Sequence, residues 1–177
     1  MQNNLFSYNI KGRYINISRI DFPLSKLQEI FEQKDLYYIF GKRIYENSFL
    51  DEIENDTWST HLIFKLNKTQ KIVGYLRIIR VKGIIEIHGG GLNKTVIEKI
   101  ALTEAWILII QYCFDCFKIA KINTSCMINN APAYKFITGT GFRKISIEYE
   151  VNRINFEIDK LEFQNNLIQQ RLTKPCW

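Results

Sequence analysis

The chain has 177 residues, of which 46% are hydrophobic and 14% aromatic, and its formal net charge is +6. This length and composition suit one folded domain with a sizeable core and argue against a disordered chain. The longest apolar run, residues 105–114, ends at Asp115, short of the roughly 20 residues that span a membrane. The first residues lack the apolar core of a secretory signal.

The positive charge favours an anionic partner but does not say which one. Lysines and arginines are scattered among acidic residues, which argues against a nucleic-acid partner. The four cysteines, Cys113, Cys116, Cys126 and Cys176, follow no disulfide framework and predict reduced thiols in the cytoplasm. Cys113 and Cys116 lie in an apolar segment without a second ligand pair at zinc spacing, so we expect no metal.

Alternating apolar and polar residues predict a first strand at Tyr14–Ile20. A helical stretch follows over residues 24–33, with Ser25 as its cap, and a second mixed helical stretch lies around Lys42–Glu54. Three strands then form a predicted meander, with turns at residues 67–70 and 82–83: His61–Leu66, Lys71–Val81 and Ile84–His88.

After the meander, Gly89–Gly91 separate the last strand from a helix, either as a bulge or as a close backbone approach to a ligand. These glycines complete neither a Walker loop nor a dinucleotide fingerprint. The length and the Ala, Glu and Leu content of Val96–Phe117 predict one long helix. A strand at Ile119–Ile128 and a short helix at Ala131–Thr138 follow.

An antiparallel pair of strands, residues 145–154 and 155–163, closes the predicted sheet. The element order predicts an α/β (α+β) fold with a mixed, mostly antiparallel sheet and helices on both faces. We expect a single domain over residues 1–177, with its core at about 14–163 and a peripheral tail at 164–177.

Four pieces of sequence share the order and spacing of a known family. Asn130 is followed by Ala133 and by Gly141-Phe142, the long helix contains Thr103-Glu104-Ala105 and Tyr112-Cys113-Phe114, and the meander ends with Glu86-Ile87. Together they resemble the GNAT superfamily of acyl-CoA-dependent N-acetyltransferases. The subgroup that acetylates ribosomal-protein N-termini is the most similar one.

The resemblance implies acetyl-CoA as co-substrate and a primary amine as acceptor: a protein N-terminus, an amino sugar or another small amine. A second copy of the chain is a further partner that the sequence allows. The strand ending at Asn129-Asn130 is expected to part from its neighbour and admit the pantetheine arm, which can pair with a strand edge as a peptide does. Asn130 would then lie near the thioester.

The sequence departs from the family at the loop before the long helix. In relatives this loop reads Gln/Arg-x-x-Gly-x-Gly/Ala, and its amides hold the pyrophosphate. Here both glycines are missing, and Thr95-x-x-Glu98 is a capping-box pattern instead. The residues that the resemblance assigns to the cofactor are Leu92, Lys94, Ile97, Glu98, Lys99, Ile100, Ala101 and Asn130.

Two alternatives follow. The amides of residues 96–101, helped by Lys94 and Lys99, still hold a pyrophosphate, which is the outcome we expect. Otherwise the chain keeps the fold as a non-catalytic module that binds a ligand or a partner.

Glu86 and His88 are the candidate bases. They lie two residues apart on one strand and therefore share a face. Glu86 could take the amine proton directly or through water, and His88 is an imidazole suited to neutral pH. Relatives often carry a carboxylate on this strand, which favours Glu86. Many relatives place a tyrosine where this chain has Ile137, as the acid for the leaving thiolate. Tyr134 and Tyr149 are the candidates that could take its place.

Overall fold

The computed structural model describes residues 9–32, 36–37, 49–56, 58–81, 83–91 and 94–166. The chain forms two compact units, which we call unit 1 (Met1–Arg80 and His88–Ala105) and unit 2 (Val81–Ile87 and Trp106–Trp177). Strand β5 (Ile84–Gly91) and helix α4 (Val96–Phe117) each contribute residues to both units. The single domain over residues 1–177 stays a prediction.

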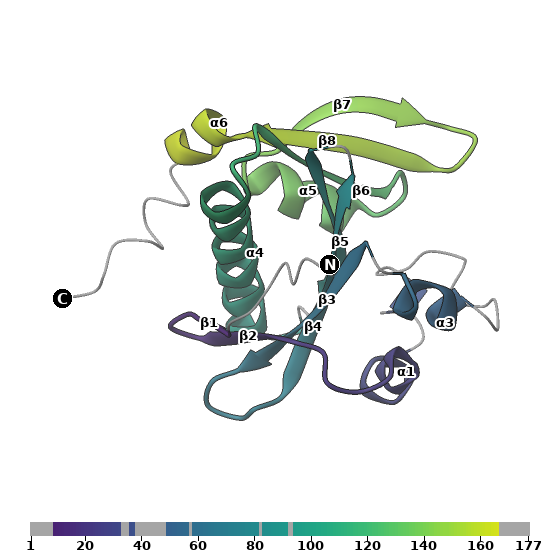
Figure 1. Ribbon diagram of the computed structural model, residues 1–177, viewed down its shortest axis with the longest axis vertical. Coiled ribbons are helices and arrows are strands. Elements are labelled where there is room, and N and C mark those ends of the chain that lie inside the picture. Colours follow the sequence, from purple (N-terminus) through teal and green to yellow (C-terminus); the bar gives the residue numbers. More distant parts are fainter. Residues whose placement is uncertain are drawn as a thin grey trace. The chain divides into compact units, whose positions relative to one another are not determined.

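The described strands form one sheet in the order β1-β2-β3-β4-β5-β6-β8-β7 (Figure 1). The remaining strands are β1 (Ile10–Lys11), β2 (Ile15–Arg19), β3 (Ser59–Leu66), β4 (Ile72–Val81), β6 (Lys121–Met127), β7 (Arg143–Glu148) and β8 (Arg153–Asp159). The β5–β6 pair is parallel, whereas β1–β2, β2–β3, β3–β4, β6–β8 and β7–β8 are antiparallel. The predicted mixed and largely antiparallel sheet is confirmed.

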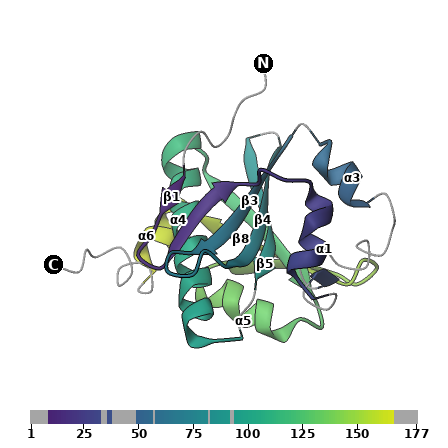
Figure 2. The ribbon, with the colours of Figure 1, turned by 90° about the horizontal axis from the view of Figure 1, so that it is seen from below.

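In unit 1, helices cover both faces of β4. Tyr75 joins a buried apolar cluster with residues of η1 (Leu24–Lys26), α1 (Leu27–Ile30) and α3 (Phe49–Glu54). Gly74, the preceding residue, faces the other way, and a Cβ there would lie 3.0 Å from Leu102 of α4. Figure 2 shows α1 and α3 together beside β3 and β4. Helices on both faces are confirmed for this unit.

The glycine run belongs to β5 and does not separate it from α4, which corrects the sequence prediction. A Cβ on Gly89 would collide with the backbone of Tyr75, and one on Gly91 would lie 2.5 Å from Leu102. Glycine is therefore needed where β5 passes close to β4 and to the start of α4.

A buried carboxylate ties the N-terminal turn to α4. Glu104 accepts the N–H of Arg13 at 2.6 Å and the N–H of Tyr14 at 2.8 Å, and only 7% of the residue is exposed. A Cβ on Gly12 would lie 2.6 Å from the Glu104 carboxyl carbon. The turn joins β1 to β2, so Glu104 fixes a short strand that the sequence pattern does not predict.

Two expected helix features differ in unit 1. Ser25 does not cap the first helical stretch: the turn begins at Leu24, with Pro23 at the cap position and no side-chain cap bond. Proline fixes φ at a value suited to helix entry, which places Ser25 inside the turn. The predicted helix around Lys42–Glu54 is confirmed over Phe49–Glu54, and residues 42–48 lie outside the described residues.

In unit 2, aromatic contacts join the second half of α4 to α5 (Ala131–Gly139) and α6 (Lys160–Asn165). The α4 ring pairs with these helices are Trp106–Phe136 and Phe114–Phe163, with centroids 5.5 and 5.7 Å apart. Trp106 also contacts Phe142, just before β7, at 6.3 Å, and Tyr134 of α5 contacts Phe156 of β8 at 5.6 Å. The strand at residues 119–128 is confirmed over Lys121–Met127.

The closing antiparallel pair is confirmed as β7–β8, but its turn lies at residues 149–152. There Asn152 adopts a φ of +53° and donates its N–H to the Tyr149 carbonyl at 3.2 Å. The end of the second expected strand is instead α6, which begins with a capping box between Asp159 and Glu162. A local polar cap thus overrides the apolar alternation.

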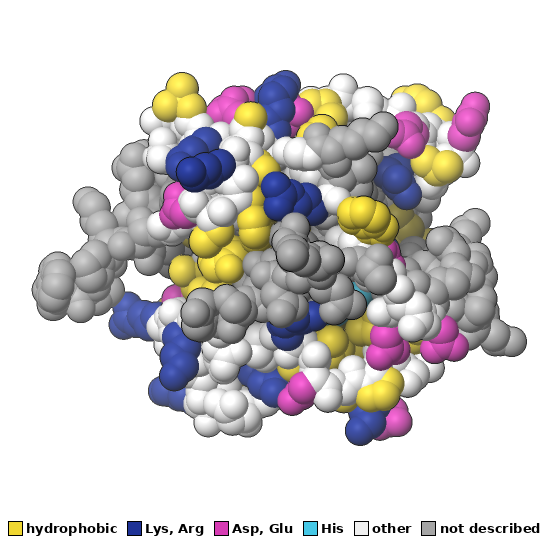
Figure 3. Space-filling model, in the orientation of Figure 1, with side chains coloured by type: hydrophobic (Ala, Val, Ile, Leu, Met, Phe, Trp, Pro, Cys, Tyr) yellow, Lys and Arg dark blue, Asp and Glu magenta, His cyan; other side chains and the backbone are white. Residues whose placement is uncertain are grey.

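Helix α4 is confirmed over its whole predicted span. Among the described residues it is the one helix long and apolar enough to cross a membrane, but more than half of that stretch is buried within the protein, as in a globular core. Burial raises the pKa of the Cys113 thiol. The described part of the chain has no cluster of three metal-ligating side chains. On the face drawn in Figure 3, basic side chains are interspersed with acidic and apolar ones.

Candidate active site

The start of α4, in unit 1, carries the predicted capping box. Thr95 donates its backbone N–H to Glu98 Oε2 at 3.0 Å, and the Glu98 N–H donates to Thr95 Oγ1 at 3.2 Å. The box satisfies two amides that a helix N-terminus otherwise offers to anions. The carboxylate of Glu98 therefore occupies the position that the resemblance assigns to a diphosphate.

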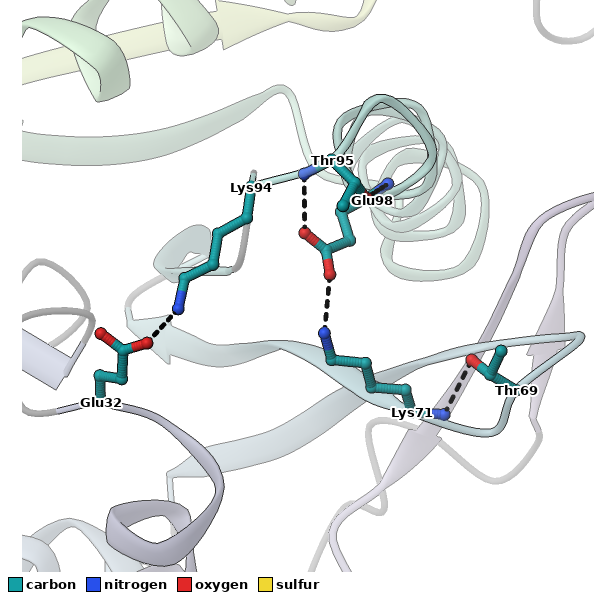
Figure 4. A network of polar contacts seen from close by, with 6 residues as sticks. All are labelled: Glu32, Thr69, Lys71, Lys94, Thr95 and Glu98. Atoms are coloured by element: carbon teal, nitrogen blue, oxygen red, sulfur yellow. Dashed lines mark hydrogen bonds and ion pairs between the residues drawn. The ribbon is translucent and has the colours of Figure 1, made fainter.

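Of two lysines near this box, Lys71 points toward Glu98, whereas the Lys94 side chain points away from the box toward Glu32 (Figure 4). Lys71, at the beginning of β4, donates to Glu98 Oε1 at 2.8 Å, and its side chain is half exposed, whereas that of Glu98 is 3% exposed. Lys94 pairs with Glu32. Although burial favours the neutral carboxyl, hydrogen bonds from Lys71 and the Thr95 amide outweigh it and lower the pKa of Glu98 below its ordinary value of 4.5.

The sign of this shift sets its pH dependence. A carboxyl whose pKa is lower in the folded chain stabilises the fold at neutral pH. That stabilisation is lost as the pH falls from about 4.5 through the lower folded pKa of Glu98.

The remaining residues at the expected cofactor site differ in their exposure to solvent. Val96, Ile97 and Ile100 are exposed, and Ala101 is buried in the core. The Lys99 amide donates to the Thr95 carbonyl at 3.1 Å, and the amides after it belong to the helix ladder. The amides of Val96 and Ile97 take no part in the capping box. They are therefore the two backbone N–H groups at the start of α4 that could donate hydrogen bonds to a phosphate. Leu92 lies outside the described residues.

Asn130, in unit 2, caps α5. Its Oδ1 accepts the N–H of Ala133 at 3.1 Å, its own N–H donates to Met127 at 3.0 Å, and 7% of the residue is exposed. Pro132 lies in the first turn of the helix, where no amide donor is needed. Gly141 adopts a φ of +99° just before β7 begins at Arg143 and so turns the chain back into the sheet.

Substitutions at Asn130 separate capping from a role near the thioester. We expect Asn130→Ala to lower the free energy of unfolding by about 1 kcal/mol through loss of the cap, and turnover by about tenfold or more. Asn130→Asp keeps the cap oxygen but not the amide N–H donors. Denaturant titration and thiol release measured on both variants decide the matter, because a residue that only caps would tolerate aspartate in both assays.

Glu86 and His88 lie on β5 and are both partly buried. Glu86 stands in register with Asn123 of β6. The parallel ladder is short, because its register runs from Ile85–Ile122 to Ile87–Thr124. Thr124 Oγ1 donates to the Ile87 carbonyl at 2.7 Å at that last rung. The ladder therefore stops before either β5 or β6 ends.

Three further tyrosine and histidine side chains make packing or buried polar contacts. Tyr134 is 37% exposed and lies edge-on against Phe156. His61 Nδ1 and the Tyr75 hydroxyl share a buried hydrogen bond of 2.7 Å, and burial raises the pKa of Tyr75. The buried contact gives His61 a structural role, and the raised pKa makes Tyr75 a poor proton donor.

Sequence reasoning missed Lys71 and Asn123. Lys71 contacts Glu98 across 27 positions, a distance over which no local pattern connects the two. Asn123 is an ordinary strand residue in the sequence, and only the register places it beside Glu86.

No family profile matches the sequence, and no curated protein is similar to it in sequence. Solved structures do match. A GCN5-related N-acetyltransferase from Brucella melitensis has a TM-score of 0.71 and 19% identity, over 93% of this chain and 84% of that one. The apo form of FdhC, a nucleotide-linked sugar GNAT, has a TM-score of 0.66 and 16% identity, over 93% and 97%.

A third match is a candidate ribosomal-protein-serine acetyltransferase from Vibrio cholerae, with a TM-score of 0.62 and 11% identity, over 86% of this chain and 98% of that one. At such identities the likeness concerns the fold. It agrees with the mixed sheet, the parallel β5–β6 pair and the long α4 described above. The chain has the fold of the GCN5-related N-acetyltransferases.

Proposed function

We propose that the protein is an acyltransferase that moves an acetyl group from acetyl-CoA to a primary amine. The observation that carries this proposal is the short parallel ladder between β5 and β6, which ends at Ile87 and Thr124 while β5 continues to Gly91. Backbone groups of β5 beyond Ile87 would pair with the amide-bearing pantetheine arm as a strand edge pairs with a peptide. The diphosphate would use the amides of Val96 and Ile97 with Lys94, Lys99 and Lys71.

In the proposed reaction the amine nitrogen attacks the acetyl carbon and the carbon–sulfur bond breaks. Glu86 takes the proton that the amine loses, directly or through water, and His88 is the alternative base on the same strand. The thiolate takes a proton from Tyr134 or from water. Asn130 would lie near the thioester.

The acceptor is a protein N-terminus, an amino sugar or another small amine. The structural neighbours include a nucleotide-linked sugar GNAT and a candidate ribosomal-protein-serine acetyltransferase, so they support both of the first two classes. Cys113, Cys116 and Cys126 are not in disulfides, and we propose a cytoplasmic setting.

Calorimetry with acetyl-CoA, followed by thiol release with a panel of amines, tests the proposal. The panel should contain peptides with free N-termini, amino sugars and simple alkylamines. We expect heat of binding with acetyl-CoA and release of free thiol with one class of amine. Absence of binding would overturn the proposal.

A second function is favoured by one observation. The Glu98 carboxylate fills the tip of α4 and is held there by Thr95 and Lys71. A chain with this internal anion could be a non-catalytic module of the same fold that binds another ligand or a partner. Such a module would show no acetyl-CoA binding in the calorimetric test.

Glu98→Gln tests whether the Glu98 carboxylate only weakens diphosphate binding at the start of α4 or prevents it. Glutamine preserves the capping box, removes the negative charge and leaves Lys71 available to a phosphate. We expect the affinity for CoA to rise about tenfold, because one like charge near a diphosphate costs about 1–2 kcal/mol. Calorimetry with CoA measures this change.

Lys71→Met is the matched control. It removes the cation but leaves the carboxylate in place, so CoA affinity should fall. If Glu98→Gln binds CoA no better than the unaltered chain, the diphosphate does not lie at the start of α4.

A further inference from the structure

A row of polar side chains crosses four strands of unit 2. The register places Glu86 of β5 opposite Asn123 of β6, Asn123 opposite Glu157 of β8, and Glu157 opposite Arg143 of β7. Residues in register on neighbouring strands project from the same face of a sheet. Asn123 therefore lies between two carboxylates.

The carboxylate on β8 already has cationic partners. Glu157 Oε1 accepts from Lys121 Nζ at 2.8 Å and is also paired with Arg143. Arg143 Nε lies 3.2 Å from Glu162 Oε1. Glu157 is thus paired with one cation from β6 and one from the edge strand β7. We therefore take Glu86 as the carboxylate of the row on which the Asn123 amide acts.

Asn123 itself has an unsatisfied atom. Its Oδ1 is buried and has no hydrogen-bond partner among the described residues. Leaving a buried acceptor unpaired costs about 1–3 kcal/mol. An ionised carboxylate cannot supply the missing hydrogen, because it only accepts. A carboxyl group that has taken up a proton can supply it.

We propose that Asn123 is a positioning residue for Glu86 and serves both protonation states of that group. When Glu86 is ionised, a half-turn of the amide lets Nδ2–H donate to the carboxylate. When Glu86 carries the proton taken from the amine, its O–H donates a hydrogen bond to Asn123 Oδ1. An amide can do this because it carries an N–H donor group and a carbonyl acceptor of similar size, which exchange places when the amide rotates. The inference rests on the proposed function, in which Glu86 is the base.

The proton balance of the step is simple. The amine nitrogen forms a bond to the acetyl carbon and gives one proton to Glu86, and the carbon–sulfur bond breaks. The thiolate takes a proton from water, and Glu86 returns its proton to solvent. Other titratable or charged groups on this face of the strands are His88, Lys121, Glu157, Asp159, Arg153, Arg143 and Glu148. Substitution of Asn123 leaves the charges of these groups in place.

Carbon-13 NMR of the full chain, labelled at glutamate carboxyls, tests the proposal without any reaction. The Glu86 signal is assigned by its loss in Glu86→Gln. We expect Asn123→Asp to raise the pKa of Glu86 by about one unit, because a like charge replaces a donor. Asn123→Leu should raise the pKa of Glu86 by less, since it removes the donor without adding a charge. Equal Glu86 titration in the unaltered chain and both variants would overturn the inference.

A kinetic measurement adds a second readout. Asn123→Leu should lower kcat about tenfold with an unchanged KM for acetyl-CoA. The acid limb of its pH–rate profile should move upward, which a merely structural role would not produce.

Asn16 supplies the matched control. It is the other described residue with a buried, unpartnered amide oxygen, but it lies on β2 in register with Lys11 and Lys65. Asn16→Leu should leave the Glu86 titration unchanged, and an equal shift in this variant would also overturn the inference. If the unaltered chain released no thiol with any amine, the proposed function would be wrong. The Glu86 titration would still show whether Asn123 interacts with Glu86.

Discussion

Glu86→Gln is expected to lower kcat for acetyl transfer by about a hundredfold, the effect of removing a general base. Glutamine keeps the size of the side chain and its place in register with Asn123, but it cannot take the proton from the amine. The KM for acetyl-CoA should not change, because the altered group acts on the acceptor. Thiol release at saturating acetyl-CoA, with the amine found in the panel, measures both quantities.

His88→Gln and Glu148→Gln are the companion variants. Glu148 is an exposed carboxylate on β7 that accepts from Asn155, so its substitution should leave kcat unchanged. His88 tests the alternative base on the same strand. If kcat holds in Glu86→Gln and falls in His88→Gln, the proton goes to the imidazole and the role assigned to Glu86 is wrong.

The elements with strong local patterns could be predicted from the sequence. Helix α4 has the predicted bounds because its apolar content and length exclude a strand, and the Thr95–Glu98 capping box is present as expected. The β3–β4 hairpin and the cap at Asn130 follow from equally local chemistry. In each case the residues that define the element lie within a few positions of one another.

Features that depend on distant partners could not be predicted. Strand β1 is two residues long and is held by Glu104, about 90 positions away in the chain. The glycines of β5 resemble a loop until β4 and Leu102 are brought against them. The β7–β8 turn was misplaced because residues 149–152 carry no glycine or proline, and a left-handed Asn152 makes the turn instead.

The motifs behind the resemblance have structural roles of their own. Asn130 caps α5, Gly141 takes a positive φ, and Glu104 holds the β1–β2 turn. The glycine pattern that serves only the pyrophosphate is the one that is absent. These retained motifs account for the successful fold prediction, whereas the proposed diphosphate site lies at the start of α4, where the Glu98 carboxylate completes the capping box.

Glu104→Ala is expected to lower the free energy of unfolding by about 3 kcal/mol, since it leaves two partly buried backbone amides without their charged acceptor. Glu104→Gln should cost about half as much, because its amide oxygen can still accept one of the two N–H groups. Denaturant titration measures both changes. Glu150→Ala, at an exposed glutamate in the β7–β8 turn, should have no measurable effect.

The contact between Glu104 and the β1–β2 turn can also be tested by a substitution in the turn, at Gly12. Gly12→Ala should destabilise the unaltered chain by about 1–3 kcal/mol, the range for overpacking, because its Cβ would lie 2.6 Å from the Glu104 carboxyl carbon. In the Glu104→Ala background that carbon is gone, and the cost of Gly12→Ala should largely disappear. A double-mutant cycle measures this coupling. Additive losses would mean that Glu104 does not hold the β1–β2 turn in solution.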